Sequence, residues 1–349
     1  MQEQEQEQEQ EQEQEQEQEQ EQEQEQEQEQ EQEQVPPPYT KLDELMGCDS
    51  LMGCDSSTDD TLFSYISHVF NTIFNLSLWI QTMMYILIEK QIVFVLDDSG
   101  SMSTPVDVPQ EDGSVIRITR WKELECSVID AFTLIIGLCP NGVDIHFLNR
   151  ESLFCVKNIE QIKQAFKTPP NGSTPLFATL QNIKNLYNGK QVSITVWTDG
   201  VPDPDDKKMA YDVFNLYYPN KKSEDYGICI VLCTDDDKVV DLYGSYDELY
   251  PLEVYDDYHS QMKAIDKVQN KHKIKIPINK GMYYALIFLA PWCKDLDSIN
   301  EKSLSVKQFN LMSEKFVNKM DPTHKYPRNF DKIQKKSIFN LFNCMSRRH

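Results

Sequence analysis

The stretch QIVFVLDDSGSM at residues 91–102 decides the fold of this chain. Its first half is an uninterrupted apolar run rich in β-branched residues, which is typical of a strand buried on both faces of a sheet. From Asp97 onward it changes to small polar residues around Gly100, which is typical of a tight loop at the end of a strand. Similar apolar runs predict further strands at 143–148, 192–198 and 226–234.

Segments with the period of a helix separate these strands. Helices are predicted at 120–139, 158–166, 174–187, 205–218 and 238–249, and the apolar segment 281–292 is expected to close the domain as a helix or a strand. Strands that alternate with helices favour right-handed crossovers and a largely parallel sheet. We therefore predict an α/β domain with a doubly wound, mostly parallel sheet flanked by helices, spanning 91–300 with its core at 91–258.

Oxygen-bearing side chains follow two of the predicted strands and open one helix. They are Asp97, Ser99 and Ser101 after the first strand, Asp199 after the strand 192–198, and Thr174 at the start of the helix 174–187. Ligands of open α/β sheets bind at the carboxyl ends of the strands, so we expect these side chains to converge there. Oxygen ligands suit a hard divalent cation. Because three of the five are neutral hydroxyls, a bound cation would keep a strong affinity for one more anionic oxygen.

The segments FVLDDSGSM, GSTPL and WTDGVPD resemble, in this order, the three parts of the metal-ion-dependent adhesion site in the von Willebrand factor A domain family. The resemblance covers 91–234 and extends to about residue 300. The Arg120-Trp121 pair and the helix that leads into the first strand are similar to small intracellular members of the family in fungi and protists.

This resemblance implies a Rossmann-like sheet with Mg²⁺ or Mn²⁺ at its top edge. It implies that Ser99, Ser101 and Thr174 bind the cation directly, and that Asp97 and Asp199 bind it directly or through water. The open coordination position would accept an Asp or Glu carboxylate from a partner protein. The alternative is a domain of this family whose metal site no longer works, but no ligand of the motif is missing.

Further aspartates lie close to the five candidate ligands. Asp98 is expected to be solvated or to support the site from outside the ligand set. Carboxylates are favoured at the positive end of a helix dipole. We therefore expect that Asp203, Asp205 and Asp206 cap the helix 205–218, and that the aspartates at 235–237 cap the next one.

The chain is predicted not to be an enzyme. Of its six histidines, His146 lies in the region of alternating strands and helices, but inside a strand, where a core histidine with satisfied hydrogen bonds is the usual interpretation. A Ser-His-Asp assembly cannot be built from local spacing, and no glycine-rich phosphate loop is present. Among enzyme activities, metal-assisted hydrolysis is the alternative that the candidate metal site leaves open.

Residues 1–34 are Met1 followed by a strict Gln-Glu alternation. Removing its 16 glutamates from the net charge of −23 leaves −7 on the rest of the chain. With no apolar face to bury, the tract is expected to be disordered. Nucleic acid is excluded as the main partner, since phosphate binding needs clustered Lys and Arg.

Residues 35–60 form a predicted linker. Within it, Pro36, Pro37 and Tyr39 fit the PPxY pattern that WW domains recognise in polyproline II conformation. The alternative is a stiff spacer. The hexapeptide LMGCDS occurs at 45–50 and again at 51–56, which we interpret as replication slippage in a linker.

Residues 61–90 are predicted to be a helical lead-in to the domain. The stretch 62–88 holds no charged residue and is long enough to span a bilayer. Its polar residues recur at three- and four-residue steps, however, and only Glu89 and Lys90 separate it from the first strand. A helix or helix pair packed on the domain is therefore the main prediction, and membrane association through 62–88 the alternative.

The remaining features concern partners and compartment. The tail 301–349 is basic and is predicted to be a partly ordered tail or an amphipathic helix at 330–348. Sparse, unpatterned cysteines and a polar N-terminus predict a reducing, cytoplasmic location, or a place in a virion if the chain is viral. A multivalent scaffold that acts through its tails is the alternative to a metal-dependent interaction module.

Overall fold

The computed structural model describes residues 66, 68–74, 76, 78–109, 114–221, 225–269, 279–293, 296 and 299, all within the unit Asp55–His349. The Gln-Glu tract, the linker with Pro36, Pro37 and Tyr39, and the tail 301–349 lie outside the described residues. The interpretations of these three segments therefore stay predictions.

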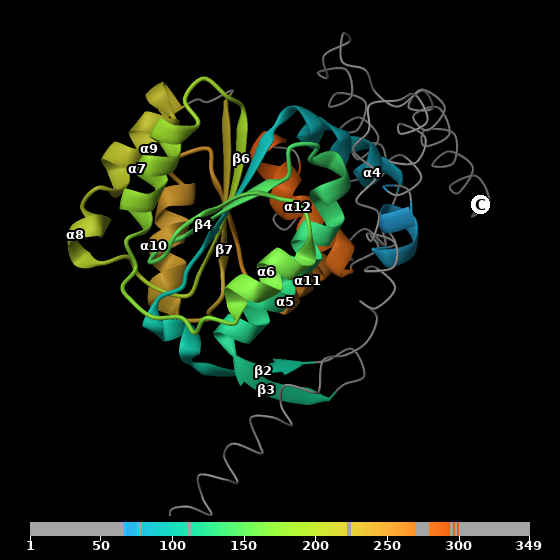
Figure 1. Cartoon of the computed structure of the whole chain (residues 1–349), viewed down its shortest axis with the longest axis horizontal. Coiled ribbons are helices and arrows are strands. Elements are labelled where there is room, and N and C mark those ends of the chain that lie inside the picture. The colour runs from blue at the N-terminus through green and yellow to red at the C-terminus, as the bar shows by residue number, and fades with distance from the viewer. Residues whose placement is uncertain are drawn as a thin grey trace, which may run out of the picture. The chain divides into compact units, whose positions relative to one another are not determined.

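A six-stranded sheet forms the centre of the domain (Figure 1). In spatial order its strands are β5 (Leu153–Val156), β4 (Val143–Phe147), β1 (Gln91–Leu96), β6 (Val192–Thr198), β7 (Tyr226–Leu232) and β8 (Glu253–Tyr255). Neighbouring strands run parallel except for β4 and β5, which are antiparallel. The predicted α/β fold with a mostly parallel sheet is confirmed, and all four strands expected from the sequence lie in this sheet.

Helices cover both faces of the sheet, as a doubly wound fold requires (Figure 1). One face carries α7 (Leu176–Leu186), α9 (Ala210–Tyr217) and α10 (Asp237–Asp247); the other carries α5 (Arg120–Ile135), α6 (Ile159–Phe166), α11 (Tyr258–Gln269) and α12 (Lys280–Leu289). Alternate side chains of β1 pack against the helices on opposite faces of the sheet. Val93 and Val95 pack in a cluster with Phe177 of α7, whereas the Phe94 ring stacks on Phe288 of α12 at 6.0 Å between centroids.

Several short elements complete the described part of the chain. They are η3 (Gly100–Ser103), the hairpin strands β2 (Pro105–Pro109) and β3 (Val115–Thr119), η4 (Ile136–Leu138), α8 (Pro204–Lys207), η5 (Pro219–Lys221) and η7 (Ala290–Trp292). The predicted helix 205–218 is thus two helices, α8 and α9. The apolar segment 281–292 is the helix α12 followed by η7. The hairpin, β5, β8 and α11 were not expected from the sequence.

The described residues of the lead-in segment pack on the domain. They form η1 (Val69–Ile73), α4 (Leu78–Met84) and η2 (Tyr85–Glu89), with Phe70, Phe74 and Ile80 among the buried side chains. A methyl group on Gly281 of α12 would lie 2.5 Å from Phe74 Cβ, so η1 and α12 are in close contact. None of the described helices is both long and apolar enough to cross a membrane.

Candidate metal centre

The carboxyl ends of four strands meet at one edge of the sheet. Leu96 of β1 is in register with Phe147 of β4 and with Trp197 of β6, and Thr198 of β6 is in register with Leu232 of β7. The loops that follow these strands therefore start side by side. As predicted, this brings together residues that lie about 100 positions apart in the sequence, which is the arrangement that ligand sites of open α/β sheets use.

The loop after β1 folds back on the carboxylate that begins it. Asp97 Oδ1 accepts a hydrogen bond from the Ser99 backbone N–H at 2.9 Å, and Asp97 Oδ2 accepts one from Thr198 Oγ1 at 2.6 Å. The Ser99 and Ser101 hydroxyl oxygens lie 3.0 Å apart. The loop thus turns one carboxylate and two hydroxyls toward the same point.

Asp199 faces this loop from the end of β6. Its Oδ1 accepts a hydrogen bond from Ser101 Oγ at 2.7 Å. Its Oδ2 pairs with Arg120 Nη1 at 2.9 Å, and Arg120 Nη2 also donates to Thr234 Oγ1 at 3.1 Å. Because one oxygen is held by the guanidinium, the other is left to the hydroxyl groups of the site.

Thr174 approaches from the loop before α7. It is buried, and a methyl group on Gly200 would lie 3.7 Å from Thr174 Oγ1 and 3.9 Å from Ser101 Oγ. Both hydroxyls therefore border the same glycine, which follows Asp199. Together with the contacts above, this places all five candidate ligands, from three loops, around one point.

This donor set fits Mg²⁺ or Mn²⁺. Adjacent oxygens around an octahedral Mg²⁺ lie about 3 Å apart, since each lies about 2.1 Å from the ion. The Ser99–Ser101 and Ser101–Asp199 oxygen separations, 3.0 and 2.7 Å, are close to this value. Within the described ranges, no group of three or more His, Cys, Asp or Glu side chains is placed to hold a metal ion, so the site depends on its hydroxyls.

Burial dominates the electrostatics of the site. It raises the pKa of Asp97 to about 6, and the neighbouring charge of Asp199 acts in the same direction, while hydrogen bonds from Ser99 and Thr198 oppose the shift. A second positive charge beside these carboxylates would relieve both the desolvation and the repulsion.

Asp98 supports the site from outside the ligand set, as one of the two sequence interpretations expected. Its Oδ1 accepts from the backbone N–H and the side-chain Nδ2 of Asn149, at 2.8 and 3.1 Å, and its Oδ2 pairs with Arg150 Nε at 2.6 Å. Asn149 and Arg150 follow β4 at the same edge of the sheet. The sequence analysis missed both, although polar residues directly after an apolar strand are the signal that found Asp97 and Asp199.

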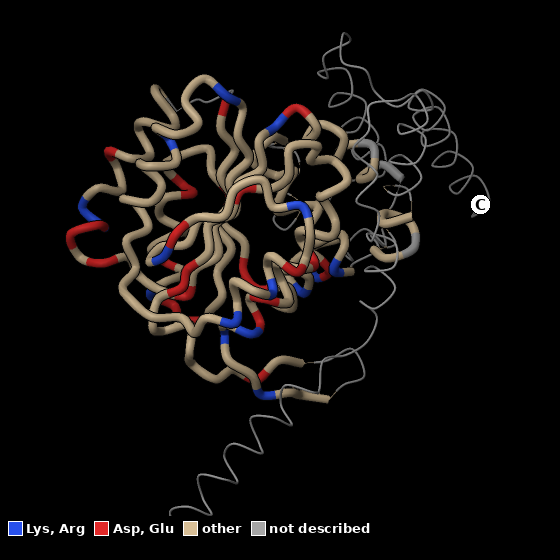
Figure 2. Tube along the Cα trace, viewed as in Figure 1, with Lys and Arg blue, Asp and Glu red and all other residues tan. Residues whose placement is uncertain are grey.

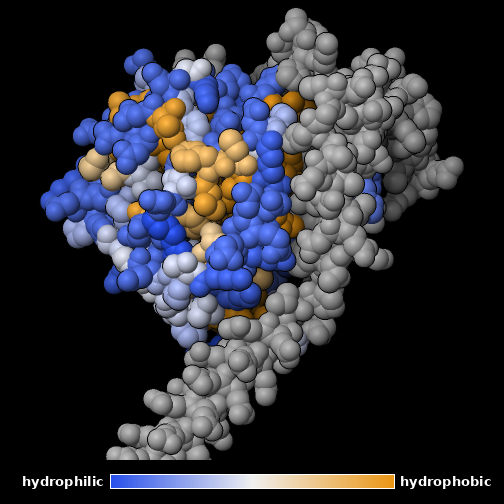
Figure 3. Space-filling view, viewed as in Figure 1, coloured by the Kyte–Doolittle hydropathy of each residue, from blue (hydrophilic) through white to orange (hydrophobic). Residues whose placement is uncertain are grey.

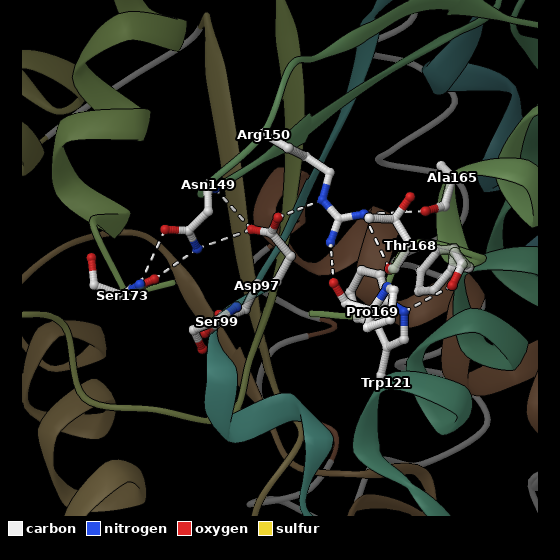
Figure 4. Close-up of polar contacts among 11 residues, drawn as sticks. Asp97, Ser99, Trp121, Asn149, Arg150, Ala165, Thr168, Pro169 and Ser173 are labelled. Atoms are coloured by element: carbon white, nitrogen blue, oxygen red, sulfur yellow. Dashed lines mark hydrogen bonds and ion pairs between the residues drawn. The ribbon is translucent and has the colours of Figure 1, made fainter. Parts of the chain in front are cut away.

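Asn149 and Arg150, which both bind Asp98, also hold the loop that carries Thr174 (Figure 4). Asn149 Nδ2 donates to Ser173 O at 2.8 Å, and Asn149 Oδ1 accepts from Ser173 N at 3.1 Å. The Arg150 guanidinium donates to three backbone carbonyls near the end of α6, those of Ala165, Thr168 and Pro169. The loop is therefore anchored at both ends to the residues after β4.

The aspartates after β6 follow the prediction only in part: Asp205 lies in the first turn of α8, but the other two bind outside that helix. Asp206 lies in α8, whose acidic turn is at the left of Figure 2. It accepts from the backbone N–H groups of Phe177 and Ala178, at 2.7 and 2.8 Å, so it caps the neighbouring α7. Asp203 accepts from Thr174 N at 3.3 Å instead of making a side-chain cap for its own helix. Asp236 does cap α10, through Lys238 N, as expected.

A scan of protein-family models finds no match to this chain, and a search of curated proteins finds none either.

Proposed function

We propose that this chain is a metal-dependent protein-interaction domain of the von Willebrand factor A type, in which a bound Mg²⁺ or Mn²⁺ accepts an Asp or Glu carboxylate of a partner protein. The observation that carries the proposal is the convergence of Asp97, Ser99, Ser101, Thr174 and Asp199 from three loops at one edge of the sheet. The order of the three motifs in the sequence supports the same assignment.

The cation and the residues around it would contribute different properties to the site. The cation would supply a positive charge with a coordination position open to one further oxygen. Ser99, Ser101 and Thr174 would hold it with neutral oxygens, so they add no negative charge. Arg120 already offsets part of the charge of Asp199. The site therefore stays short of anionic oxygen, which is the property that would draw in a partner carboxylate.

The rim of the site suits a protein partner. Val201 follows Asp199 and Gly200, and its side chain is exposed. An apolar contact beside a charged one is the usual make-up of a protein interface. We propose that this interaction takes place in the cytoplasm, because sparse and unpatterned cysteines favour a reducing compartment.

The test is a calorimetric titration of Mg²⁺ and of Mn²⁺ into the full chain. We expect saturable binding in the wild type and at least a tenfold loss of affinity in the Ser99→Ala, Ser101→Ala double variant. Ser103→Ala is the matched control, since Ser103 is an exposed serine of the same loop. A folded wild type that binds neither ion would contradict the proposal and would favour a scaffold that acts through its tails. Where the ion binds, capture of Asp- or Glu-bearing partner proteins must be lost in EDTA.

A further inference from the structure

A chain of hydrogen bonds at the β4–β5 side of the sheet joins four side chains that the candidate metal centre does not use. Tyr187 OH donates to Asp144 Oδ2 at 2.7 Å and lies 3.1 Å from His146 Nε2. On the other side of the imidazole, Ser152 Oγ lies 2.8 Å from Nδ1. The order is therefore Asp144, Tyr187, His146 and Ser152.

The hydrogen bonds fix the tautomer of His146. The Asp144 carboxylate is an acceptor, since it also receives the backbone N–H of Cys155 at 2.7 Å and Gln91 Nε2 at 3.0 Å. Tyr187 gives its single hydroxyl proton to this carboxylate, so toward His146 it can only accept. Nε2 must then carry the imidazole proton. This leaves the lone pair of Nδ1 to accept the proton of the Ser152 hydroxyl.

The surroundings keep His146 in its basic, neutral form. Burial lowers the pKa of His146, and the charge of Asp144 opposes this shift without cancelling it. The groups that face the imidazole and its relay are Asp144 of β4, Tyr187 after α7, Ser152 before β5 and Cys155 of β5; Lys190 lies over the Tyr187 ring at 5.5 Å. A neutral imidazole that is hydrogen-bonded to a hydroxyl is the arrangement of a general base and its nucleophile.

The serine at the end of this relay is partly exposed, and an exposed aromatic ring lies beside its histidine. Ser152 is half-buried, whereas His146, Tyr187 and Asp144 are buried. The Phe154 ring packs edge-on against the imidazole at 5.5 Å between centroids, and its side chain is 54% exposed. Hydrophobic side chains gather around β4 on the face shown in Figure 3. A small apolar acyl group has a surface to lie on beside the hydroxyl.

We propose that Ser152 is a nucleophile that takes an acyl group from small activated esters, with His146 as its general base and with Tyr187 and Asp144 as positioning residues. Ser152 Oγ forms the new bond to the carbonyl carbon, and its proton passes to His146 Nδ1. The bond from that carbon to the leaving phenol or alcohol breaks, and the proton returns to the leaving oxygen. The product is an acyl-serine ester. Hydrolysis of this ester uses water in place of Ser152, with His146 again as the base.

The test treats the full chain with p-nitrophenyl acetate in EDTA, and mass spectrometry locates the acetyl group. EDTA keeps the outcome independent of the metal proposal. We expect acetylation at Ser152, abolished in Ser152→Ala and slowed on the order of 10²-fold in His146→Gln, the span of general-base catalysis. The rate should fall as the pH is lowered through the pKa of His146. Ser245→Ala is the control, because the hydroxyl of Ser245 donates to the Leu242 carbonyl and has no histidine partner in the relay. We expect this variant to be acetylated at Ser152 at the rate of the wild type.

Tyr187→Phe keeps the aromatic ring but removes the relay hydroxyl, so it covers the case in which His146→Gln fails to fold. We expect this variant, with an unchanged circular dichroism spectrum, to react about tenfold more slowly than the wild type. Equal rates would overturn the relay. A folded wild type that is acetylated at Ser152 no faster than at Ser245 would overturn the nucleophile itself, and would make His146 a core residue that merely satisfies its hydrogen bonds.

Discussion

Arg120 lies where its guanidinium bonds to both Asp199 and Thr234, and its charge compensates a carboxylate whose side chain is fully buried. Arg120→Met leaves Asp199 without this partner, and removing one member of a buried ion pair costs about 3 kcal/mol. We expect a lower midpoint of thermal unfolding in EDTA. We also expect Mg²⁺ to raise that midpoint more in the variant than in the wild type, because the cation and the guanidinium share one carboxylate.

Differential scanning fluorimetry with and without Mg²⁺ measures both effects. Arg117→Met is the control, since Arg117 is an exposed residue of β3. If Mg²⁺ shifts the Arg120 variant and the wild type equally, the guanidinium does not share Asp199 with the metal.

At the residue scale, the sequence identifies the candidate ligands better than it identifies the hydrogen-bond partners that position them. The five candidate ligands could be named because each follows a strand or opens a helix, and strand ends of a parallel sheet share an edge. The bonds from Asn149 to Asp98 and Ser173 could not, since they depend on which strand lies next to β1. The same holds for the relay through Tyr187, which is 41 residues from His146 and far beyond local spacing.

Among the structural elements, the loop before α7 depends most on neighbouring segments for its shape. Gly172 has a φ of 121°, and a methyl group there would lie 2.3 Å from Asn149 Oδ1. Asn149→Ala removes the side-chain bonds to Asp98 and Ser173, leaves the backbone N–H bond to Asp98 in place, and adds no bulk. Each lost hydrogen bond costs about 1 kcal/mol, so we expect faster amide exchange at Ser173 and Thr174 with or without metal. We also expect roughly tenfold weaker Mg²⁺ binding.

Hydrogen exchange followed by mass spectrometry gives the first result, and calorimetry gives the second. Asn185→Ala, on an exposed position of α7, is the matched control. Unchanged exchange in the loop of the Asn149 variant would show that the remaining backbone contacts suffice to hold Thr174. Weaker metal binding without faster exchange would point to a change elsewhere in the site.

The elements that the sequence did not predict are those with weak local signals. β5 and β8 have four and three residues and lie at the two edges of the sheet, and β2 has prolines at both ends. The predicted helix 205–218 is interrupted between Lys207, where α8 ends, and Ala210, where α9 begins. Asp206 of its first turn binds the backbone amides of α7, a contact that the sequence pattern does not show. Short edge strands and caps between helices depend on contacts with neighbouring elements, so the hydrophobic periodicity of the sequence does not predict them.

At the scale of the whole molecule, the lead-in segment is part of the core. Each of the nine residues Gly281–Leu289 of α12 is buried, and α4 and η1 pack along this helix. Within the segment, Gln81 Nε2 donates to Leu76 O at 2.7 Å and to Asn71 Oδ1 at 2.9 Å, which ties α4 to η1. The described residues of a segment that is apolar enough to suggest a membrane span in the sequence thus pack on the domain, in part against α12.

Removing this segment should therefore unfold the domain, although it precedes every strand of the sheet. Burying one large apolar side chain contributes about 1.5–3 kcal/mol, and the segment buries Phe70, Phe74, Ile80 and Met83, among others. A typical domain is stable by about 5–15 kcal/mol, so the loss is comparable with the whole stability of the domain. We expect a chain that starts at residue 91 to lose its cooperative unfolding transition and to aggregate. A chain that starts at Asp55, the first residue of the unit Asp55–His349, should keep it. Near-ultraviolet circular dichroism and gel filtration of the two chains decide this, and a monomeric, cooperatively unfolding chain from residue 91 would show that α12 tolerates exposure.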